Sequence, residues 1–421
     1  MRETHLDGVF ADFEARTAPT FRPPGLAATG RRVRDRRRRR RGLLAGLAAL
    51  LLAGPGGAYA LAGRDGDDVP PTPAPASPSP SPGGPPVSRR IVVPGVAGEL
   101  RELRFVDARH AWALFDTCDP DDDLASTDCR RDLARTEDGG ASWRRIPLPG
   151  TANDPTPGSR PYLLVTDDQQ VTLAVAGRFL VTPDGGTSFT EHPMTDPPPV
   201  TQRALGTRSG FLLTCPAPNR FTGRACDRQE LIHAKRGRLP AQPPVDLGPT
   251  ADRQLVEGRG GRLWLSVVEG DRMTVVVSDD QGLSWRKLPP VPGARRLLVS
   301  PNGADAWLVS VDAVDFQASA TERVWSLEGD GWRTHVGLPD NTLHVAAVDG
   351  GRLVVTGAYG TVGFWTPAGY QDRPEVRVPS WAVSQETGIE VLRDGTIVLE
   401  NQRSWTVGVG TGVERAWTRL S

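Results

Sequence analysis

The sequence predicts an all-β protein, a seven-bladed β-propeller with a six-bladed propeller as the alternative. Two observations lead to this fold class. An eight-residue motif, [Ser/Thr]-x-Asp-x-Gly-x-Ser-[Trp/Phe], occurs at 136–143, 182–189 and 278–285. Pairs of apolar runs joined by tight turns recur in the same phase. A repeat of about 40–50 residues that contains four strands is typical of propellers.

The spacing of the motif sets the repeat length. The first two copies end 46 residues apart, at Trp143 and Phe189, and the third ends 96 residues later, at Trp285. The longer interval is about twice the shorter one, which predicts a degenerate copy at 232–240. Seven units of about 48 residues then fit the chain. The last three units are expected to carry degenerate copies that end at Trp332, Tyr370 and Trp417.

Each unit also opens with an apolar run, a tight turn and a second apolar run. The strand composition and turn residues of these segments are typical of β-hairpins. Two hairpins in each unit make a four-stranded blade, and no long amphipathic helix is expected after residue 88. The opening hairpins begin at Leu103, Tyr162, Gln254, Leu297 and Leu343.

The motif is expected to form the turn between the third and fourth strands of a blade. Its Asp then accepts backbone N–H bonds in an Asx-turn, and its Gly supplies a positive φ. The aromatic residue begins the outer strand and packs between neighbouring sheets. The carboxylates are therefore expected to be structural. The hydroxyl, Asp, Gly and aromatic positions are Thr136, Asp138, Gly140 and Trp143, then Thr182, Asp184, Gly186 and Phe189, then Ser278, Asp280, Gly282 and Trp285.

Three segments precede the propeller, which is expected over 89–421. Residues 1–41 form a disordered Arg-rich tail. Residues 42–63 carry no charge and, as a helix of roughly 33 Å, are long enough to cross a bilayer core. Residues 64–88 form an extended Pro/Ser-rich linker. The arginines before the apolar segment predict a single-pass membrane protein with a cytoplasmic N-terminus and an extracytoplasmic propeller.

A cleavable signal peptide is the alternative for the apolar segment. Small-x-small cleavage sites occur at Ala58-Tyr59-Ala60 and Ala60-Leu61-Ala62, and the strongly apolar part is short. The propeller is secreted in that case. A charged leader of 41 residues is long for a signal peptide, which favours the anchor.

The distribution of charge excludes a nucleic-acid partner. The chain holds 50 basic and 50 acidic residues, so its formal net charge is zero. The basic excess lies in the N-terminal tail, and the remainder of the chain is acidic on balance. A nucleic-acid-binding protein needs the basic excess on its folded domain.

The four cysteines predict two local disulfides and no zinc site. Their spacing is not that of a zinc site, and no histidine lies at ligand spacing. An oxidising compartment agrees with export of the propeller. Asp119, Asp121 and Asp123 have the spacing of a calcium loop, but Leu124 and Arg130 stand where that loop needs Gly and Glu, so no metal or other cofactor is expected. The expected pairs are Cys118 with Cys129 and Cys215 with Cys226.

The eight-residue motif resembles the Asp-box, also called the bacterial neuraminidase repeat. The resemblance covers about 89–421 and implies the blade rather than the activity. Asp-boxes occur in sialidases, xyloglucan-type endoglucanases, sortilin-like receptors and the photosystem II assembly-factor family. A seven-bladed propeller is similar to the photosystem II assembly-factor family, and this resemblance implies a binding scaffold.

A sialidase-like exo-glycoside hydrolase is the alternative that the resemblance implies. Sialidases are six-bladed and use an Arg triad, a Tyr–Glu nucleophile pair and an Asp acid/base. They also carry Arg-Ile-Pro before the first Asp-box, whereas Arg145-Ile146-Pro147 follows it here. Tyr359 is a weak candidate for the nucleophile, and no pair of acids is expected to converge at the channel mouth.

Arginines at a shared repeat offset are the candidate ligand-binding residues. Arg203, Arg253 and Arg296 each lie four residues before the residue taken to open the turn of their unit, namely Thr207, Glu257 or Ser300. An equal offset predicts an equal height in the channel, and a basic arc suits carboxylates or phosphates. Ordinary solvated arginines are the alternative. Arg160, and Arg101 or Arg104, lie close to the same position in two further units.

The sequence therefore predicts an actinobacterial-style membrane-anchored or secreted propeller that binds without catalysis. The expected ligand is an envelope protein, a peptide or a glycan at the channel mouth where the inner strands begin. The protein then serves as a scaffold or sensor, and no cofactor is expected. In a third interpretation the cytoplasmic tail recruits a signalling partner.

Overall fold

The computed structural model confirms an all-β, seven-bladed propeller. The chain divides into two compact units, Met1–Pro75 and Ala76–Ser421. All described residues lie in the second unit: 80–117, 129–153, 161–194, 196, 198, 206–207, 209–214, 228–248, 252–310, 323–335, 337–339, 342–357, 359–378, 387–401 and 404–421.

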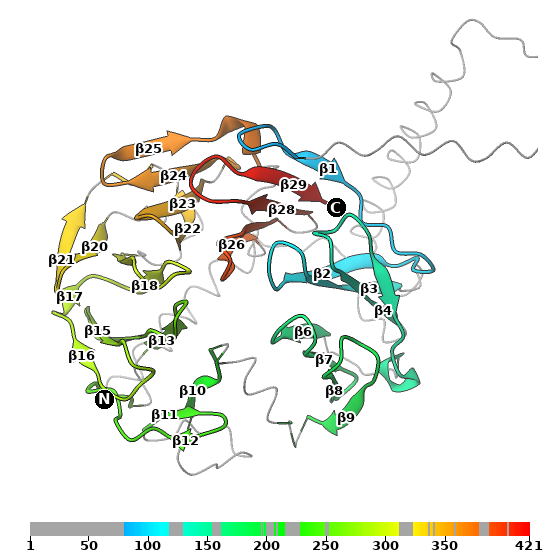
Figure 1. Cartoon of the computed structure of the whole chain (residues 1–421), viewed down its shortest axis with the longest axis horizontal. Helices are drawn as coiled ribbons and strands as arrows, with labels where there is room; N and C mark the ends of the chain where they lie inside the picture. The colour runs from blue at the N-terminus through cyan, green and yellow to red at the C-terminus, as the bar shows by residue number, and fades with distance from the viewer. Residues whose placement is uncertain are drawn as a thin grey trace, which may run out of the picture. The chain divides into compact units, whose positions relative to one another are not determined.

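Seven antiparallel sheets follow one another around a central channel, and each corresponds to one predicted unit (Figure 1). In chain order the sheets comprise β2 (Glu99–Phe105), β3 (Ala111–Thr117), β4 (Arg130–Thr136) and β5 (Arg144–Ile146); β6 (Tyr162–Val165), β7 (Val171–Val175), β8 (Arg178–Thr182) and β9 (Thr190–Pro193); β10 (Phe211–Thr214), β11 (Glu230–His233) and β12 (Gly237–Arg238); β13 (Asp252–Glu257), β14 (Leu263–Glu269), β15 (Arg272–Ser278), β16 (Arg286–Lys287) and β17 (Val291–Pro292); β18 (Arg296–Val299), β19 (Ala306–Val309), β20 (Val324–Glu328) and β21 (Gly331–His335); β22 (Thr342–Val348), β23 (Arg352–Gly357), β24 (Val362–Thr366) and β25 (Gly369–Asp372); and β26 (Thr387–Val391), β27 (Ile397–Asn401), β28 (Ser404–Val409) and β29 (Ala416–Leu420).

The described part of the third blade begins at its second strand. The N–H of Thr207 bonds to the carbonyl of Phe211, as the N–H of Gly258 bonds to that of Arg262 in the fourth blade. Thr207 and Gly258 therefore open equivalent turns, and β10 pairs with β11 as a second strand pairs with a third. The innermost strand of this blade falls outside the described residues.

The core consists of hydrophobic layers between adjacent sheets. Trp143 packs with Trp405 and Leu420 between the first and seventh blades, and Trp112 packs with Leu173 between the first and second. Comparable layers lie between each later pair from the third blade to the seventh. Helix is confined, in the described ranges, to two short 3₁₀ turns, η1 (Gly150–Asn153) and η2 (Pro374–Val376).

A segment before the first blade adds a fifth strand to the last one. β1 (Val87–Arg89) pairs in parallel with β29, with Val87 opposite Thr418. The N–H of Ile91 then donates to the carbonyl of Ser421 at 2.9 Å, and Val93 is buried in the layer between the first and seventh blades. Residues 87–93 thus join the two ends of the ring.

The three Asp-boxes form the turns between third and fourth strands, as predicted. In the third copy the Ser278 hydroxyl donates to Asp280 at 2.8 Å and accepts the N–H of Gly282 at 2.7 Å. Asp280 also accepts the N–H of Ser284 at 2.8 Å and its hydroxyl at 2.6 Å. The other two copies repeat these bonds.

The predicted membrane segment, 42–63, lies outside the described residues. Within the ranges that the structure describes, no helix is both long and apolar enough to span a bilayer. The anchor and the topology that follows from it stay predictions.

Candidate functional site

The Asp-box carboxylates are committed to their turns. The hydroxyl and the N–H of Ser284, together with the Ser278 hydroxyl, lower the pKa of Asp280 to about 2. The equivalent bonds from Ser188 lower the pKa of Asp184. A carboxylate that accepts several local donors is a structural group, so these aspartates are not available to a ligand.

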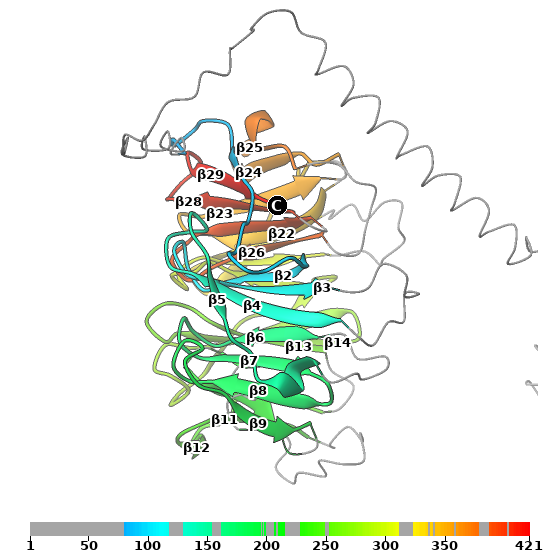
Figure 2. The same cartoon turned by 90° about the vertical axis from the view of Figure 1, so that its right-hand side faces the viewer.

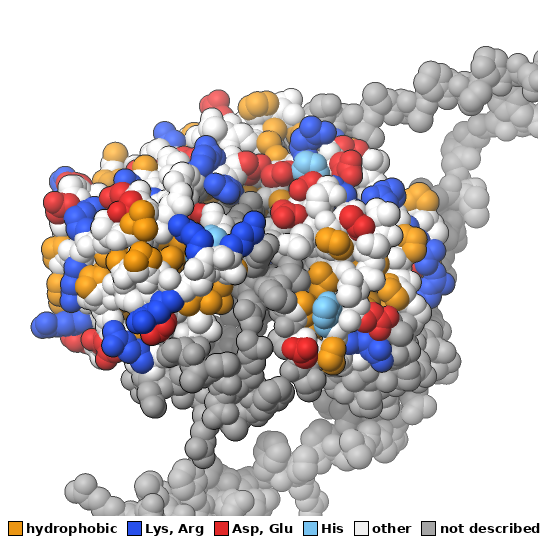
Figure 3. Space-filling model, turned by 60° about the horizontal axis from the view of Figure 1, so that its bottom comes forward, with side chains coloured by type: hydrophobic (Ala, Val, Ile, Leu, Met, Phe, Trp, Pro, Cys, Tyr) orange, Lys and Arg blue, Asp and Glu red, His pale blue; other side chains and the backbone are white. Residues whose placement is uncertain are grey.

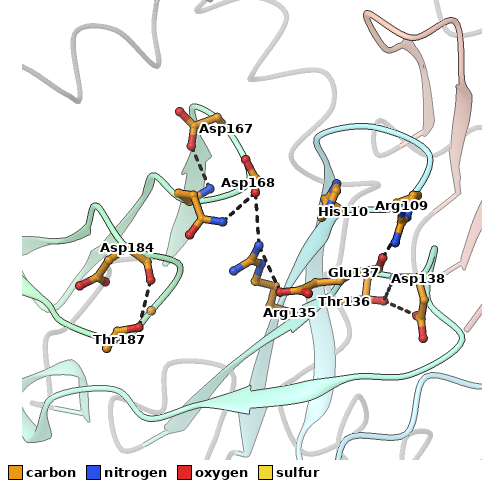
Figure 4. A network of polar contacts seen from close by, with 12 residues as sticks. Arg109, His110, Arg135, Thr136, Glu137, Asp138, Asp167, Asp168, Asp184 and Thr187 are labelled. Carbon is orange, nitrogen blue, oxygen red and sulfur yellow. Dashed lines mark hydrogen bonds and ion pairs between the residues drawn. The ribbon is translucent and has the colours of Figure 1, made fainter.

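A polar network joins the first two Asp-box turns on the same edge of the ring (Figure 4). Arg135 lies between Glu137 and Asp168, with ion-pair distances of 3.3 and 3.4 Å from its Nη2 atom. Its guanidinium also stacks 5.5 Å from the centre of the Trp112 ring, and only 6% of the residue is exposed. Asp168 belongs to the second blade, so this buried arginine ties two blades together and is not available to a ligand.

The turns between first and second strands share this edge with the Asp-boxes. Gly139 of the first Asp-box donates to the carbonyl of Arg109, and Gly185 of the second donates to that of Gln169. We call this edge the Asp-box face. The inner strands begin at the opposite face of the ring (Figure 2), which also carries the described turns between second and third strands, such as those that follow Val175 and Glu269.

Three carboxylates from two blades surround Arg104 on the inner wall. Glu102 on the same strand is 2.7 Å from Arg104 Nε, and Glu400 of β27 is 4.0 Å from its Nη1. Glu390 of β26 also acts on this guanidinium, and together the acids raise the pKa of Arg104 despite its burial. Glu102 accepts the N–H of Leu163 at 2.9 Å as well. The cluster is therefore an ion-pair network that links neighbouring blades.

The basic arc predicted from an equal offset is wrong for Arg253 and Arg296. Ser300 opens its turn by bonding to Asp305, and its equivalent in the fourth blade is Gly258. Arg296 lies four residues before that point and Arg253 lies five before it. Because successive side chains of a strand point to opposite faces, the two arginines do not share one position.

The contacts of the two arginines differ accordingly. Arg253 Nη1 donates to the side chain of Gln229, in the third blade. Arg296, the first residue of β18, lies instead near His344 of β22, in the sixth blade, where burial and then the charge of Arg296 lower the pKa of His344. Partial burial also lowers the pKa of Arg296 itself. Among the described residues Arg296 forms no ion pair, and it is exposed at the start of β18, so its guanidinium is open to a ligand.

A cavity of about 280 Å³ lies at the Asp-box end of the channel. Inner strands of the fourth, fifth and seventh blades supply apolar walls that include Val256, Val299 and Val391. Glu257, Glu390 and Arg393 are its charged lining residues. The cavity thus combines apolar walls with two carboxylates and one arginine.

A turn of the seventh blade contacts two other blades beside this cavity. Arg259, in the fourth blade, donates through Nη2 to the carbonyl of Arg393 at 2.7 Å. Asp394 accepts the N–H of Ala108 from the first blade at 2.7 Å. Because the fourth and seventh blades are not neighbours in the ring, the first of these bonds bridges the channel. The cavity is therefore bounded by protein towards the Asp-box face.

Tyr359 lies just after β23 and is 71% exposed. Within the described part of the chain no hydrogen bond joins it to a carboxylate, which is the pairing that a sialidase-like nucleophile needs. Arg145 and Ile146 belong to the outer strand β5, as the sequence predicts, and Pro147 follows it. This strand lies at the edge of its sheet opposite the inner strand β2.

Several predicted site residues lie outside the described residues. Cys129 is described and buried, at the start of β4, and the connections that hold the expected disulfides run between second and third strands as predicted. The two disulfides stay predictions. The residues outside the described ranges are Arg160, Arg203, Cys118, Cys215, Cys226, Asp119, Asp121 and Asp123.

Sequence reasoning missed Glu390, Glu400 and His344. Each is a polar residue in a largely apolar strand, a signal that these strands share with many edge strands. Acidic and basic side chains are also mixed over the face seen in Figure 3, so the view shows no continuous field of one sign.

Comparisons with known proteins give only distant structural likenesses. No protein-family model matches the chain, and no curated protein matches it. Among solved structures, one described as YCF48 bound to D1 peptide is 14% identical, with a TM-score of 0.40 over 73% of this chain and 92% of that one. An ancestral GH74 enzyme is 12% identical, with a TM-score of 0.41 over 82% of this chain and 48% of that one. YCF48 from Cyanidioschyzon merolae is 10% identical, with a TM-score of 0.30 over 75% of this chain and 96% of that one.

Proposed function

We propose that this chain is a non-catalytic binding module whose propeller holds a carboxylate-bearing segment of a protein, peptide or glycan in its channel. One observation carries the proposal: Arg296 is exposed at the start of the innermost strand β18 and forms no ion pair among the described residues. A ligand carboxylate can accept two parallel N–H bonds from such a guanidinium.

His344 is the neighbour of Arg296 that contributes to the selectivity of this position. It lies close enough to Arg296 for the arginine, together with burial, to lower its pKa. A neutral imidazole beside the guanidinium adds a hydrogen-bonding group without a second charge. The pair therefore favours one planar anion over a multiply charged phosphate.

Hydrolysis of glycosides is the second candidate, because three carboxylates converge on the inner wall. Glycosidases need two carboxyl groups on opposite sides of the substrate, roughly 5–10 Å apart. Here Glu102 and Glu400 flank Arg104 in an ion-pair network. A cation at the centre of the acids occupies the space that a scissile bond needs, which favours binding over catalysis.

The setting that we propose for this module is the outer side of a membrane. The uncharged segment at 42–63, preceded by the arginines of the tail, supports an anchor with the propeller outside the cytoplasm. The expected partner is then another component of the cell envelope. A protease-accessibility assay on intact cells tests this topology, and a propeller protected from external protease would contradict it.

Binding is tested with the full chain and a pair of peptides that differ only in Glu against Gln. We expect the Glu peptide to bind at least tenfold more tightly, and Arg296→Gln to abolish the difference. Arg272→Gln is the matched control, because Arg272 is 66% exposed on a hairpin tip. Equal binding of the two peptides, or an unchanged preference in Arg296→Gln, would contradict the proposal.

Catalysis is tested with the same protein on a fluorogenic glycoside panel that includes sialosides and β-glucosides. We expect no turnover above background. Turnover that disappears in Tyr359→Phe or Glu390→Gln would make the chain a glycoside hydrolase.

A further inference from the structure

We infer that the cavity at the Asp-box end of the channel is a subsite for an amphipathic cation, the side chain of a lysine or arginine in a bound segment. The inference rests on the proposed function, which supplies the bound segment. It gives a ligand to the end of the channel opposite the carboxylate site. It goes beyond the carboxylate site because its ligand has the opposite charge.

The charge of Glu257 favours a cation. This carboxylate accepts the N–H of Ser209 at 2.9 Å and the Ser209 hydroxyl, and both donors are neutral. No ion pair involves it in the part of the chain that the structure describes. Neutral donors orient a carboxylate without cancelling its charge, so its field remains directed into the cavity.

Glu390 adds a second carboxylate to the same cavity. It lies at the end of β26 and contributes to the field around Arg104. Arg393 is the basic member of the lining, and its backbone carbonyl is held by Arg259. Two carboxylates and one guanidinium line the cavity, and Glu390 divides its field between the cavity and Arg104.

The apolar walls select the stem of the cation. Val256, Val299 and Val391 come from three different blades and converge on the cavity. Lysine and arginine bury their aliphatic stems on apolar surface and keep the charged head at a polar group. A small hydrated metal ion gains nothing from such walls. The cavity therefore matches a long amphipathic side chain.

The cavity has room for one long side chain and is close in volume to the smallest pockets that enclose a whole ligand. Pockets that enclose a whole small molecule measure roughly 300–1,000 Å³, and this one measures about 280 Å³. The turn that joins Arg393 to Arg259 bounds it on one side. A segment that enters from the opposite face can therefore place one side chain in the cavity without passing through the ring.

The separation of the two ends predicts the spacing of the charges in the ligand. Arg296 begins β18 and Val299 ends it, so they lie roughly 10 Å apart along the strand at about 3.3 Å per residue. An extended ligand covers that distance in about three residues. The acid and the lysine or arginine of the bound segment are therefore expected about two to four residues apart.

The test is calorimetric titration of the full chain with Nα-acetyl-lysine methylamide and with its norleucine counterpart, which has the stem and lacks the charge. We expect the lysine probe to bind at least tenfold more tightly than the norleucine probe. Glu390→Gln and Glu257→Gln are each expected to weaken the lysine probe at least fivefold. Asp271→Asn is the matched control, because Asp271 is 78% exposed on a hairpin tip.

Each outcome decides the inference. Equal binding of the two probes, no binding of the lysine probe, or unchanged binding in Glu390→Gln would overturn it. If Glu257→Gln loses its fold by circular dichroism, because its bond to Ser209 also joins two blades, Glu390→Gln decides alone. The Arg296→Gln variant is expected to bind the lysine probe as before and to lose its preference for the Glu peptide. A failure of the cation subsite is therefore distinguishable from a failure of the proposed carboxylate site.

Discussion

The glycine of the Asp-box meets two separate requirements at once. Gly186 has a φ of +89°, a region that L-residues avoid. A Cβ on Gly186 would also lie 2.4 Å from Cγ2 of Ile146, on the outer strand of the preceding blade. Gly282 meets Leu239 in the same way, at 2.6 Å. The turn is therefore a docking point between blades as well as a local staple.

Replacement of Gly186 separates these two requirements. Gly186→Ala combines a strained φ with a clash and is expected to cost roughly 3 kcal/mol of unfolding free energy. Gly177→Ala is the control, because Gly177 has a φ of +71° and no atom within 4 Å of its would-be Cβ. It should cost only about 1 kcal/mol. Urea unfolding measures both, and equal losses would show that contact with Ile146 contributes nothing.

At the scale of the strand, one residue of register decides what an arginine contacts. The sequence places Arg253 and Arg296 at the same offset only if Glu257 opens the fourth turn. The hydrogen bonds show that Gly258 opens it. Both residues are plausible turn openers in the sequence, so the register had to come from the pairing of the strands.

The degenerate Asp-boxes form their turns by other means. In the fifth blade Glu328 pairs with Gly331 across a two-residue turn, and Thr366 pairs with Gly369 likewise in the sixth. The seventh blade uses a buried cation, Arg415, which is 2% exposed. An arginine thus replaces the missing aspartate by donating to carbonyls instead of accepting N–H groups. Its guanidinium bonds to the carbonyls of Gly395, Gly408, Gly410 and Gly412.

Loss of Arg415 is expected to destabilise the last blade. Burial lowers the pKa of Arg415 to about 10, so it stays charged at neutral pH. Arg415→Met leaves several carbonyls without a donor and should cost about 3 kcal/mol. Arg272→Met removes an arginine that is 66% exposed and should change stability little. Thermal unfolding compares the two, and similar melting temperatures would contradict the role given to Arg415.

At the scale of the whole molecule, closure of the ring depends on residues that precede the first blade. β1 covers the edge of β29, and Ile91 and Val93 bury their side chains between the first and seventh blades. An uncovered strand edge exposes unpaired N–H and C=O groups. The linker end is therefore part of the domain.

Truncation tests this closure. A chain that lacks residues 1–93 should exchange its amide hydrogens faster in β29, while β14 keeps its protection. The reason is that only the hydrophobic layer between the first and seventh blades is weakened. A chain that lacks residues 1–79 keeps β1 and should behave like the full protein. Hydrogen-exchange mass spectrometry measures both strands, and unchanged exchange in β29 would contradict the role of β1.

The sequence by itself determined the fold, the number of blades and the position of the Asp-box turns. These features recur along the chain, so seven imperfect copies together define the repeat length and the boundaries of the blades. The backbone conformation of each Asp-box turn requires its glycine and aspartate. The channel was decided only by the tertiary structure. Its residues, such as Arg104, Glu390 and His344, occur once each and come from different blades. Side chains that do not repeat meet only when the ring closes, and strand register then decides whether each one reaches the channel or a neighbouring blade.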